Sequence, residues 1–159
     1  CLRMVTSNDA AEEYGRKNDL EFWQSAIPAS NLGRIIADPQ SAAVMPERIF
    51  GAENRSQWCY YFEKADLARQ NQNWAETIRW YEDAQAAGFA PLLDSEWIPL
   101  VEAYLETGDY EKAMQVTQSV DNTNAGDNAG LCSLWQDFQE NEADNAASVE
   151  AIDWLKCGQ

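Results

Sequence analysis

The sequence contains no histidine among its 159 residues, and this absence removes several kinds of chemistry. Ser–His–Asp and Cys–His catalytic arrangements both need a histidine, and zinc sites with histidine ligands are excluded for the same reason. None of the four cysteines belongs to a CxxC pair, so a metal site made of cysteines alone is not expected. The phosphate-binding patterns GxxxxGKS/T and GxGxxG are missing as well. The sequence therefore predicts no catalytic residue, no metal ligand and no cofactor site.

Carboxylate pairs are present but carry little information about catalysis. Glu102 and Glu106, for example, stand four residues apart, which places them on one face of a helix. With 27 Asp and Glu residues in the chain, such pairs are inevitable, so they are no evidence for general acid–base catalysis. We expect this chain not to be an enzyme.

Basic residues are scarce: 11 Lys and Arg stand against 27 Asp and Glu, for a net charge of −16. A nucleic-acid partner requires a basic surface, and an anionic membrane surface attracts basic segments, so neither is expected as a partner. Two interpretations of the acidity remain. The simpler one is a solvated surface that keeps the chain soluble, and the other is a groove for a basic partner.

Long hydrophobic runs are also absent. No apolar stretch approaches the roughly 18 residues that cross a bilayer, so the chain as given is expected to be soluble. It begins with Cys1 rather than Met, which suggests a fragment or a processed product. A lipoprotein with a lipidated first cysteine is one version, but Leu2 and Arg3 fit it poorly, and we favour a trimmed fragment.

What the sequence does contain is a repeat. From Trp58 to Val120 one plan recurs: an apolar-periodic helix, a tight polar turn and a second such helix. Aligning the turns gives units that start near Trp58, Asp94 and Asn128, at spacings of 36 and 34 residues. A single hairpin of this kind cannot bury its apolar face alone, so neighbouring hairpins are expected to stack.

Residues that start and stop helices stand where this plan requires them. Gly88 and Gly108 can adopt the left-handed conformation that ends a helix, and Asn73 and Asp109 can cap the helices that follow. Pro99 falls in the first turn of its helix, where the missing N–H has little effect.

The third unit is less regular. Residues 131–138 carry apolar side chains at the i, i+3, i+4, i+7 spacing of an amphipathic helix, and a second helix is expected over 145–156 after a cap at Asp144. Residues 121–130 are rich in Asn, Asp and Gly and are predicted to be a turn region. This last hairpin would end the stack.

The chain resembles the tetratricopeptide repeat (TPR), whose units have about 34 residues. Lys64 and Gln72 depart from the usual Leu and Gly of the first unit. The resemblance implies an all-α fold, an α–α superhelix of about three TPR-like hairpins over residues 58–159. Residues 1–57 would form an irregular, partly helical segment, with a short helix over 30–38, that packs on the first hairpin. The middle unit carries the best matches, at Trp97, Tyr104, Gly108, Tyr110 and Ala113.

The cysteines allow more than one arrangement. Cys59 lies among aromatic residues and is expected to be a small buried hydrophobic side chain. Cys132 and Cys157 fall near the start and the end of the last hairpin, where antiparallel helices would bring them within reach. The sequence leaves open whether they form a disulfide, which requires an oxidising compartment.

The same TPR resemblance suggests a binding surface. In such stacks the first helix of each pair lines a concave face, which would hold a peptide or protein partner of basic character. Alternatively, Phe62 and Ile98 pack under the N-terminal segment and the other side chains form a solvated face, and the sequence does not decide between these. The partner-binding residues implied by the resemblance are Phe62, Asp66, Arg69, Gln70, Ile98, Glu102 and Glu106.

A second resemblance concerns the runs RIFGAENRSQWCYYFEKADLARQNQNW and SEWIPLVEAYLETGDYEKA. They look like the C-terminal soluble part of a group of bacterial multi-spanning membrane proteins related to dolichyl-mannosyltransferase-type glycosyltransferases. This resemblance implies an accessory soluble domain on the extracytoplasmic side, tethered through an N-terminal region that this sequence lacks. It would contact a glycan or a partner enzyme, with Trp23 and Trp58 suited to sugar stacking, although core packing explains both residues equally well. A non-catalytic interaction scaffold and such an accessory domain are the two functions that we carry forward.

Overall fold

The computed structural model describes residues 1, 29, 31, 34, 46–120, 129–142 and 145–157. Every regular element within these residues is helical, which confirms the prediction of an all-α chain. Most of the expected helix over 30–38, residues 121–128 of the expected turn region and most of segment 1–57 lie outside the described residues. Residues 129 and 130 belong to a helix rather than to the expected turn. Asp144 also lies outside the described residues, and the cap of the last helix is Asn145, whose side chain accepts from the backbone N–H of Ala147. The elements in order are α3 (Glu47–Phe50), α4 (Trp58–Gln70), α5 (Trp74–Ala86), the 3₁₀ helix η4 (Asp94–Trp97), α6 (Ile98–Glu106), α7 (Tyr110–Ser119), α8 (Ala129–Asn141) and α9 (Ala146–Trp154).

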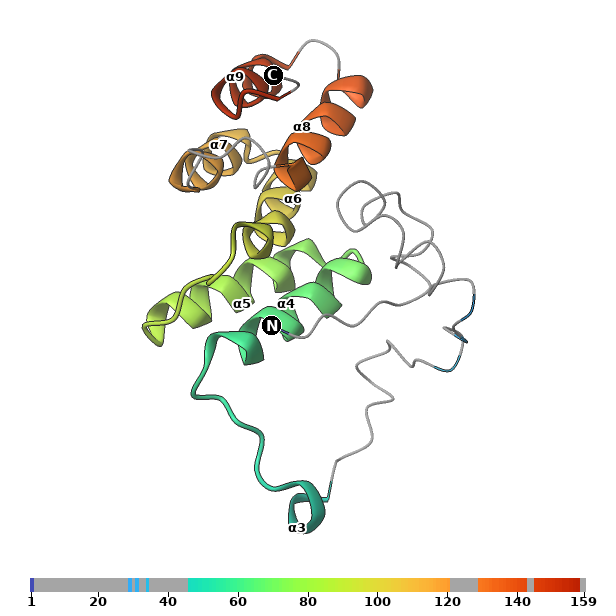
Figure 1. Ribbon diagram of the computed structural model, residues 1–159, viewed down its shortest axis with the longest axis vertical. Coiled ribbons are helices and arrows are strands. Elements are labelled where there is room, and N and C mark those ends of the chain that lie inside the picture. Colours follow the sequence, from blue (N-terminus) through green and yellow to red (C-terminus); the bar gives the residue numbers. More distant parts are fainter. Residues whose placement is uncertain are drawn as a thin grey trace.

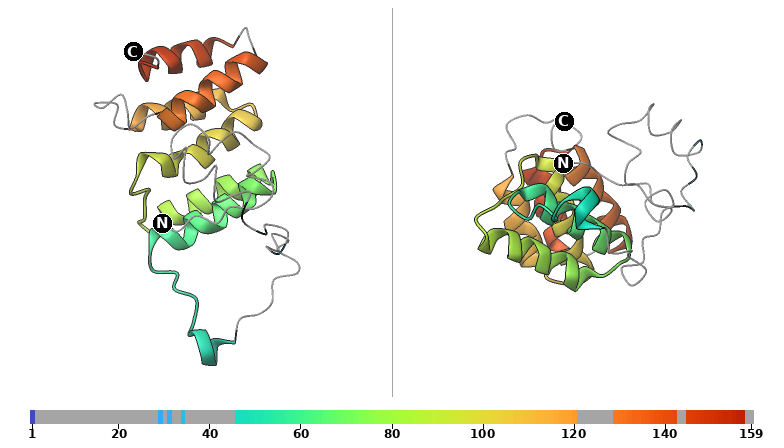
Figure 2. Two further views of the ribbon diagram at one scale, coloured as in Figure 1. Left: turned by 45° about the vertical axis from the view of Figure 1, so that its right-hand side comes forward. Right: turned by 90° about the horizontal axis from the view of Figure 1, so that it is seen from below.

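Consecutive helices pack in pairs, and the pairs stack along the long axis of the molecule (Figures 1 and 2). The pairs are α4 with α5, α6 with α7, and α8 with α9. The first helices of the pairs contact one another, α4 against α6 and α6 against α8, and α5 and α7 pack against α6 and α9, respectively. Within the described part of the chain, no helix is long and apolar enough to pass through a membrane.

Local signals account for the helix boundaries. The side chains of Asn73 and Asp109 accept hydrogen bonds from the backbone N–H groups of Glu76 and Lys112, at 3.4 and 3.3 Å, and so cap α5 and α7 as predicted. Gly108 takes the left-handed conformation after α6 at φ 77°. Gln72 takes the same conformation after α4 at φ 55°, although it is not a glycine.

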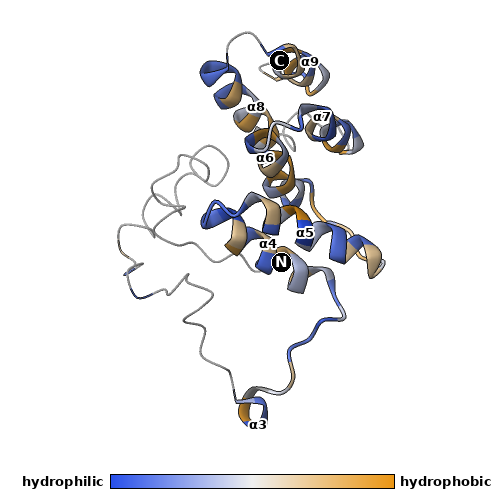
Figure 3. Cartoon of the chain, turned by 180° about the vertical axis from the view of Figure 1, so that it is seen from behind, coloured by the Kyte–Doolittle hydropathy of each residue, from blue (hydrophilic) through white to orange (hydrophobic). Residues whose placement is uncertain are grey.

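Two apolar clusters form the core. One joins α4 and α5 to the start of α6 around Trp58, Phe62 and Tyr81, and the other joins α6, α7, α8 and α9 around Val101 and Trp135. In Figure 3 the ribbon of α6, which contributes to both clusters, is largely apolar. Among the side chains of the first two hairpins, Ala65, Tyr81, Val101 and Ala113 are buried, and Tyr61, Trp80, Trp97 and Tyr104 are half-buried.

Two disulfides are present. Cys132 at the start of α8 is bonded to Cys157 just after α9, with Cα atoms 5.5 Å apart. The sequence left open whether these two cysteines form a disulfide, and in this structure they do. Cys59 is bonded to Cys1, with Cα atoms 5.0 Å apart. The prediction that Cys59 is only a small buried hydrophobic side chain is therefore wrong. Its partner is 58 residues away in sequence, a separation that helical periodicity does not link.

Candidate functional site

The seven side chains that the TPR resemblance assigns to a binding face do not all reach solvent. Glu106 is exposed and Glu102 is half-buried. The other five are buried in this structure, so the expectation of one open face does not hold for them. They are Phe62, Asp66, Arg69, Gln70 and Ile98.

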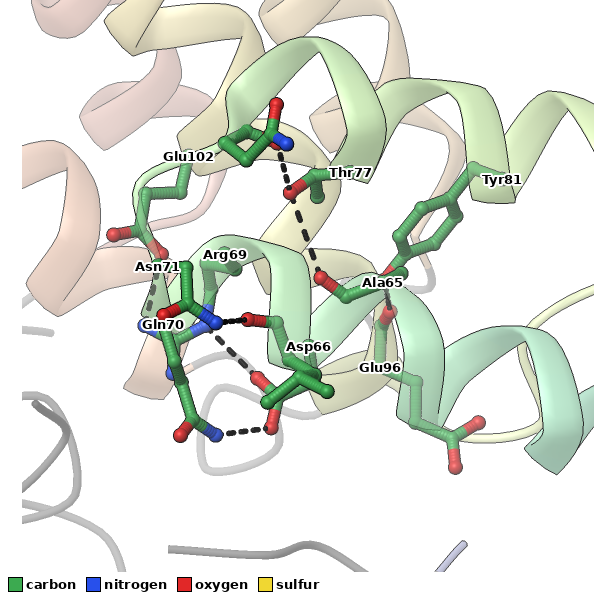
Figure 4. Close-up of polar contacts among 11 residues, drawn as sticks. Ala65, Asp66, Arg69, Gln70, Asn71, Thr77, Tyr81, Glu96 and Glu102 are labelled. Carbon is green, nitrogen blue, oxygen red and sulfur yellow. Dashed lines mark hydrogen bonds and ion pairs between the residues drawn. The ribbon is translucent and has the colours of Figure 1, made fainter. Parts of the chain in front are cut away.

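Four of these residues form a buried polar network between α4 and α6 (Figure 4). The guanidinium of Arg69, which is 1% exposed, donates from Nε to Asp66 Oδ1 at 2.8 Å. Asp66 Oδ2 accepts a second hydrogen bond from Gln70 Nε2 at 3.0 Å. Arg69 Nη1 also lies 3.5 Å from Glu102 Oε2, which joins α4 to α6. The network thus neutralises carboxylates from both helices and closes this part of the face.

Trp58 is equally unavailable to a ligand. Its side chain is 4% exposed, its ring packs on Phe62 and Tyr81, and its Nε1 donates to Glu96 Oε2 at 2.7 Å. Glu96 is itself buried and accepts from the backbone N–H of Leu92 at 2.9 Å. The suggestion that Trp58 stacks on a sugar is therefore wrong, since its ring belongs to the core. Trp23 lies outside the described residues.

The face opens between α6 and α8. There a cleft of about 590 Å³, which we call the α6–α8 cleft, lies between the end of α6, the turn into α7 and the second half of α8. Glu102 and Glu106 from the predicted face form part of its wall. The remaining lining residues are Leu105, Thr107, Gly108, Tyr110, Leu134, Asp137, Phe138, Asn141 and Glu142.

The apolar part of this lining is partly aromatic. The rings of Tyr110 and Phe138 contact each other with centroids 5.5 Å apart, and Phe138 packs edge-on against Trp135 at 6.1 Å. Tyr110, Phe138 and Leu134 are half-buried, so each has one side in the core and another toward the cleft. These contacts hold the apolar wall in place.

All charged residues that line the α6–α8 cleft are acidic: Glu102, Glu106, Asp137 and Glu142. The neighbouring base Lys112 is already engaged, because its ammonium lies 2.7 Å from Asp109 and 5.4 Å from the ring centroid of Tyr104. Hydrogen bonding by this ammonium holds the pKa of the Asp109 carboxyl below its usual value, and the pKa of Lys112 is raised in turn. The cleft therefore has a negative potential.

The sequence argument found Glu102 and Glu106 but missed the wall opposite them. Tyr110 was identified only as a match to the repeat, and Phe138 only as the end of the apolar pattern over residues 131–138. Asp137, Asn141 and Glu142 were not singled out. A signal was available in the spacing, since Asp137 and Phe138 stand four residues before Asn141 and Glu142. Within the described part of the chain, no three acidic or cysteine side chains are grouped as a metal site.

Comparisons of this chain with protein-family models, with curated proteins and with solved structures gave no match.

Proposed function

We propose that this chain is a non-catalytic interaction scaffold of three stacked TPR-like hairpins, which binds a peptide segment of a protein partner. The observation that carries the proposal is the α6–α8 cleft, which combines an apolar, partly aromatic wall with a polar rim. Its volume of about 590 Å³ falls within the roughly 300–1,000 Å³ range of sites that enclose small ligands or side chains.

The order of packing supports the repeat interpretation. The first helices α4, α6 and α8 contact one another in sequence, as expected for stacked hairpins that each contact mainly their neighbours. Such stacks present a continuous surface along their first helices, and a peptide is a ligand long enough to use it. Among the described residues, the cleft that borders these first helices lies between α6 and α8, so the peptide would lie across α6 and α8 rather than across α4.

A peptide selection tests this proposal. Random peptides displayed on phage are selected on the purified protein, and the best binders are titrated against two variants. Asn141→Trp fills the α6–α8 cleft from its rim. Asn71→Trp is a matched control, because the amide of each asparagine donates to the carbonyl four residues earlier, at 2.9 Å to Asp137 and 2.8 Å to Leu67.

We expect Asn141→Trp to weaken binding of the selected peptides by about tenfold or more, and Asn71→Trp to leave it unchanged. Circular dichroism should give the same melting temperature for both variants, since both positions are exposed. If no peptide is enriched, or if the peptides bind Asn141→Trp as well as they bind the original protein, the scaffold proposal is overturned.

We further infer that this part of the chain works in an oxidising compartment. Its two disulfides involve all four cysteines, and disulfides persist in extracytoplasmic environments and are rare in the cytosol. Alkylation of protein isolated from its native cells, followed by mass spectrometry, should find no free thiol. Quantitative alkylation of all four cysteines would contradict this inference.

A further inference from the structure

The charges that line the α6–α8 cleft indicate which side chain of a peptide it would bind. Its acidic residues come from two separate helices, Glu102 and Glu106 from α6, and Asp137 from α8 with Glu142 just after it. No basic residue is among those that line the cleft, although Glu102 also pairs with Arg69 of α4. A cationic group that enters would reduce the repulsion between like charges.

The helix ends add to this preference. The C-terminal turns of α6 and α8 both border the cleft, at Glu106 and Asn141, and a helix C-terminus carries a partial negative charge. Basic side chains are favoured in this position, yet neither helix has one in its last turn. The two partial charges and the exposed carboxylates of Glu106, Asp137 and Glu142 therefore all favour a positive group in the same cleft.

The apolar wall narrows the choice of cation. Tyr110 and Phe138 offer adjacent aromatic rings, and the buried side chain of Leu105 lies beside them. A cation attached to an aliphatic stem can place the stem on these side chains and its charged end among the carboxylates. A guanidinium also stacks on aromatic rings, and its five donors can reach acceptors on both helices, which a compact ammonium does less well.

We propose that the α6–α8 cleft is the specificity site of the scaffold and that it binds an arginine side chain of the partner peptide. This inference rests on the proposed scaffold function, whose ligand class it makes specific. Arg69 provides an internal parallel, because its guanidinium lies between Asp66 of one helix and Glu102 of the next. The partner's arginine would make the corresponding bridge one helix farther along the stack.

A single amino acid derivative is a sufficient probe. N-acetyl-arginine amide is titrated into ¹⁵N-labelled protein, and the backbone resonances are followed by NMR. We expect saturable shifts confined to residues around the cleft, such as Glu106, Gly108 and Asp137, with a dissociation constant on the order of millimolar. The citrulline derivative has the same shape without the charge and should cause no saturable shift, and the lysine derivative should bind severalfold more weakly.

Matched variants separate the cleft from the overall charge. Glu106→Gln with Asp137→Asn removes two charges from the cleft and should weaken the arginine probe by about tenfold, since hydrogen bonds to charged groups are the stronger ones. Glu63→Gln with Glu150→Gln removes the same charge from exposed positions that do not line the cleft, and should leave binding unchanged.

Three results would overturn the inference: no saturable shift with the arginine probe, equal shifts with citrulline, or the same shifts with calcium chloride at equal concentration. The peptide selection distinguishes this failure from failure of the scaffold proposal. Peptides that need an open cleft but contain no arginine would leave the scaffold intact and refute the arginine site. Binding of the arginine probe without enrichment of any peptide would support the arginine site and refute the scaffold proposal.

Discussion

The contact between α4 and α6 and the contact between α6 and α8 join helices in equivalent places of the stack, but their polar groups differ. At the first contact Arg69 from α4 lies between Asp66 and Glu102, and its guanidinium is almost completely buried. At the second contact the charged residues that line the gap are all acidic, and a cleft of about 590 Å³ remains. Glu102 belongs to both places, since it pairs with Arg69 and also lines the cleft.

The difference shows that the stack alone does not create a groove. Acidic residues are present at both the α4–α6 contact and the α6–α8 contact. At the closed α4–α6 contact, Arg69 pairs with them. At the open α6–α8 contact, no basic residue lines the cleft. The closed contact thus contains a complementary charge that is absent from the lining of the open one.

The largest effect should follow from Arg69→Leu. Removing the guanidinium leaves Asp66 and Glu102 close together without their shared cation in a buried place, and breaking a buried ion pair in this way costs about 3–5 kcal/mol. Urea denaturation should show this loss in the free energy of unfolding. Arg79→Leu is the control, because Arg79 pairs with Glu76 and Asp83 on the surface and should cost less than about 1 kcal/mol. A loss as small as that of Arg79→Leu would mean that the buried network is not needed for closure.

The next effect concerns the disulfide that holds the open side. Replacing Cys132 and Cys157 by Ala removes a cross-link between residues 25 apart in sequence, which should lower the free energy of unfolding by about 3 kcal/mol. Because α8 is one wall of the α6–α8 cleft, peptide binding should weaken as well. Replacing Cys1 and Cys59 by Ala removes the cross-link to α4, at the closed α4–α6 contact. This change should lower the free energy of unfolding without weakening peptide binding. Equal effects of the two pairs on binding would show that the cleft does not depend on the position of α8.

The sequence predicted the helices well because their boundaries are set locally. Asn73 and Asp109 cap helices, and Gly108 ends one, through contacts with residues at most five positions away. The burial of Arg69 could not be predicted in the same way. It depends on Glu102, which is distant in sequence, and therefore on how α4 sits against α6.

The opposite wall of the cleft was missed for a related reason. Asp137 and Phe138 face the end of α6 only because of the offset between α6 and α8, which repeat alignment does not give. The Cys1–Cys59 pair was missed because periodicity says nothing about a partner outside the repeat. The sequence thus supports inferences about hairpins better than inferences about the contacts between them.

The turns that end α4 and α6 allow a smaller, paired test of the two sides. Both turns have the same hydrogen bonds, from Asn73 to the carbonyl of Ala68 and from Asp109 to that of Tyr104, each at 2.9 Å. Gln72 adopts the left-handed conformation that Gly108 adopts more easily, at φ 55° and 77°, respectively. Left-handed backbone costs a non-glycine residue about 1–2 kcal/mol, and glycine loses about 0.5–1 kcal/mol more chain entropy on folding.

Gln72→Gly should therefore stabilise the protein by roughly 0.5–1 kcal/mol, and Gly108→Gln should destabilise it by a similar amount. A Cβ at Gly108 meets no atom within 4 Å, so the second effect should come from the backbone alone. The melting temperatures of the two variants should accordingly move in opposite directions. Shifts in the same direction would show that the turns are not equivalent.

Supplying the missing cation should have a smaller effect on stability and a large one on binding. Asn141→Arg places a guanidinium at the rim of the α6–α8 cleft and at the C-terminus of α8, where a cation contributes about 0.3–1 kcal/mol. The variant should be slightly more stable than the original protein and should no longer bind the arginine probe. Asn71→Arg, just after α4, is the control and should bind the probe normally. An Asn141→Arg protein that still binds would place the arginine site elsewhere.

The smallest effect on stability should come from the pH dependence of the exposed ion pair between Glu76 and Arg79. A hydrogen bond from Arg79 lowers the pKa of Glu76 below its ordinary value of 4.5, so the unfolded chain takes up this proton at a higher pH than the folded one. The stabilisation is therefore complete above the unfolded pKa and is lost as pH falls through the folded pKa. Since Glu76 and Arg79 are 36% and 47% exposed, it should stay below about 1 kcal/mol. Urea denaturation of the original protein and of Glu76→Gln should differ slightly at neutral pH, and the difference should shrink as the pH falls below 4.5. A difference that grows on acidification would reverse the assigned sign.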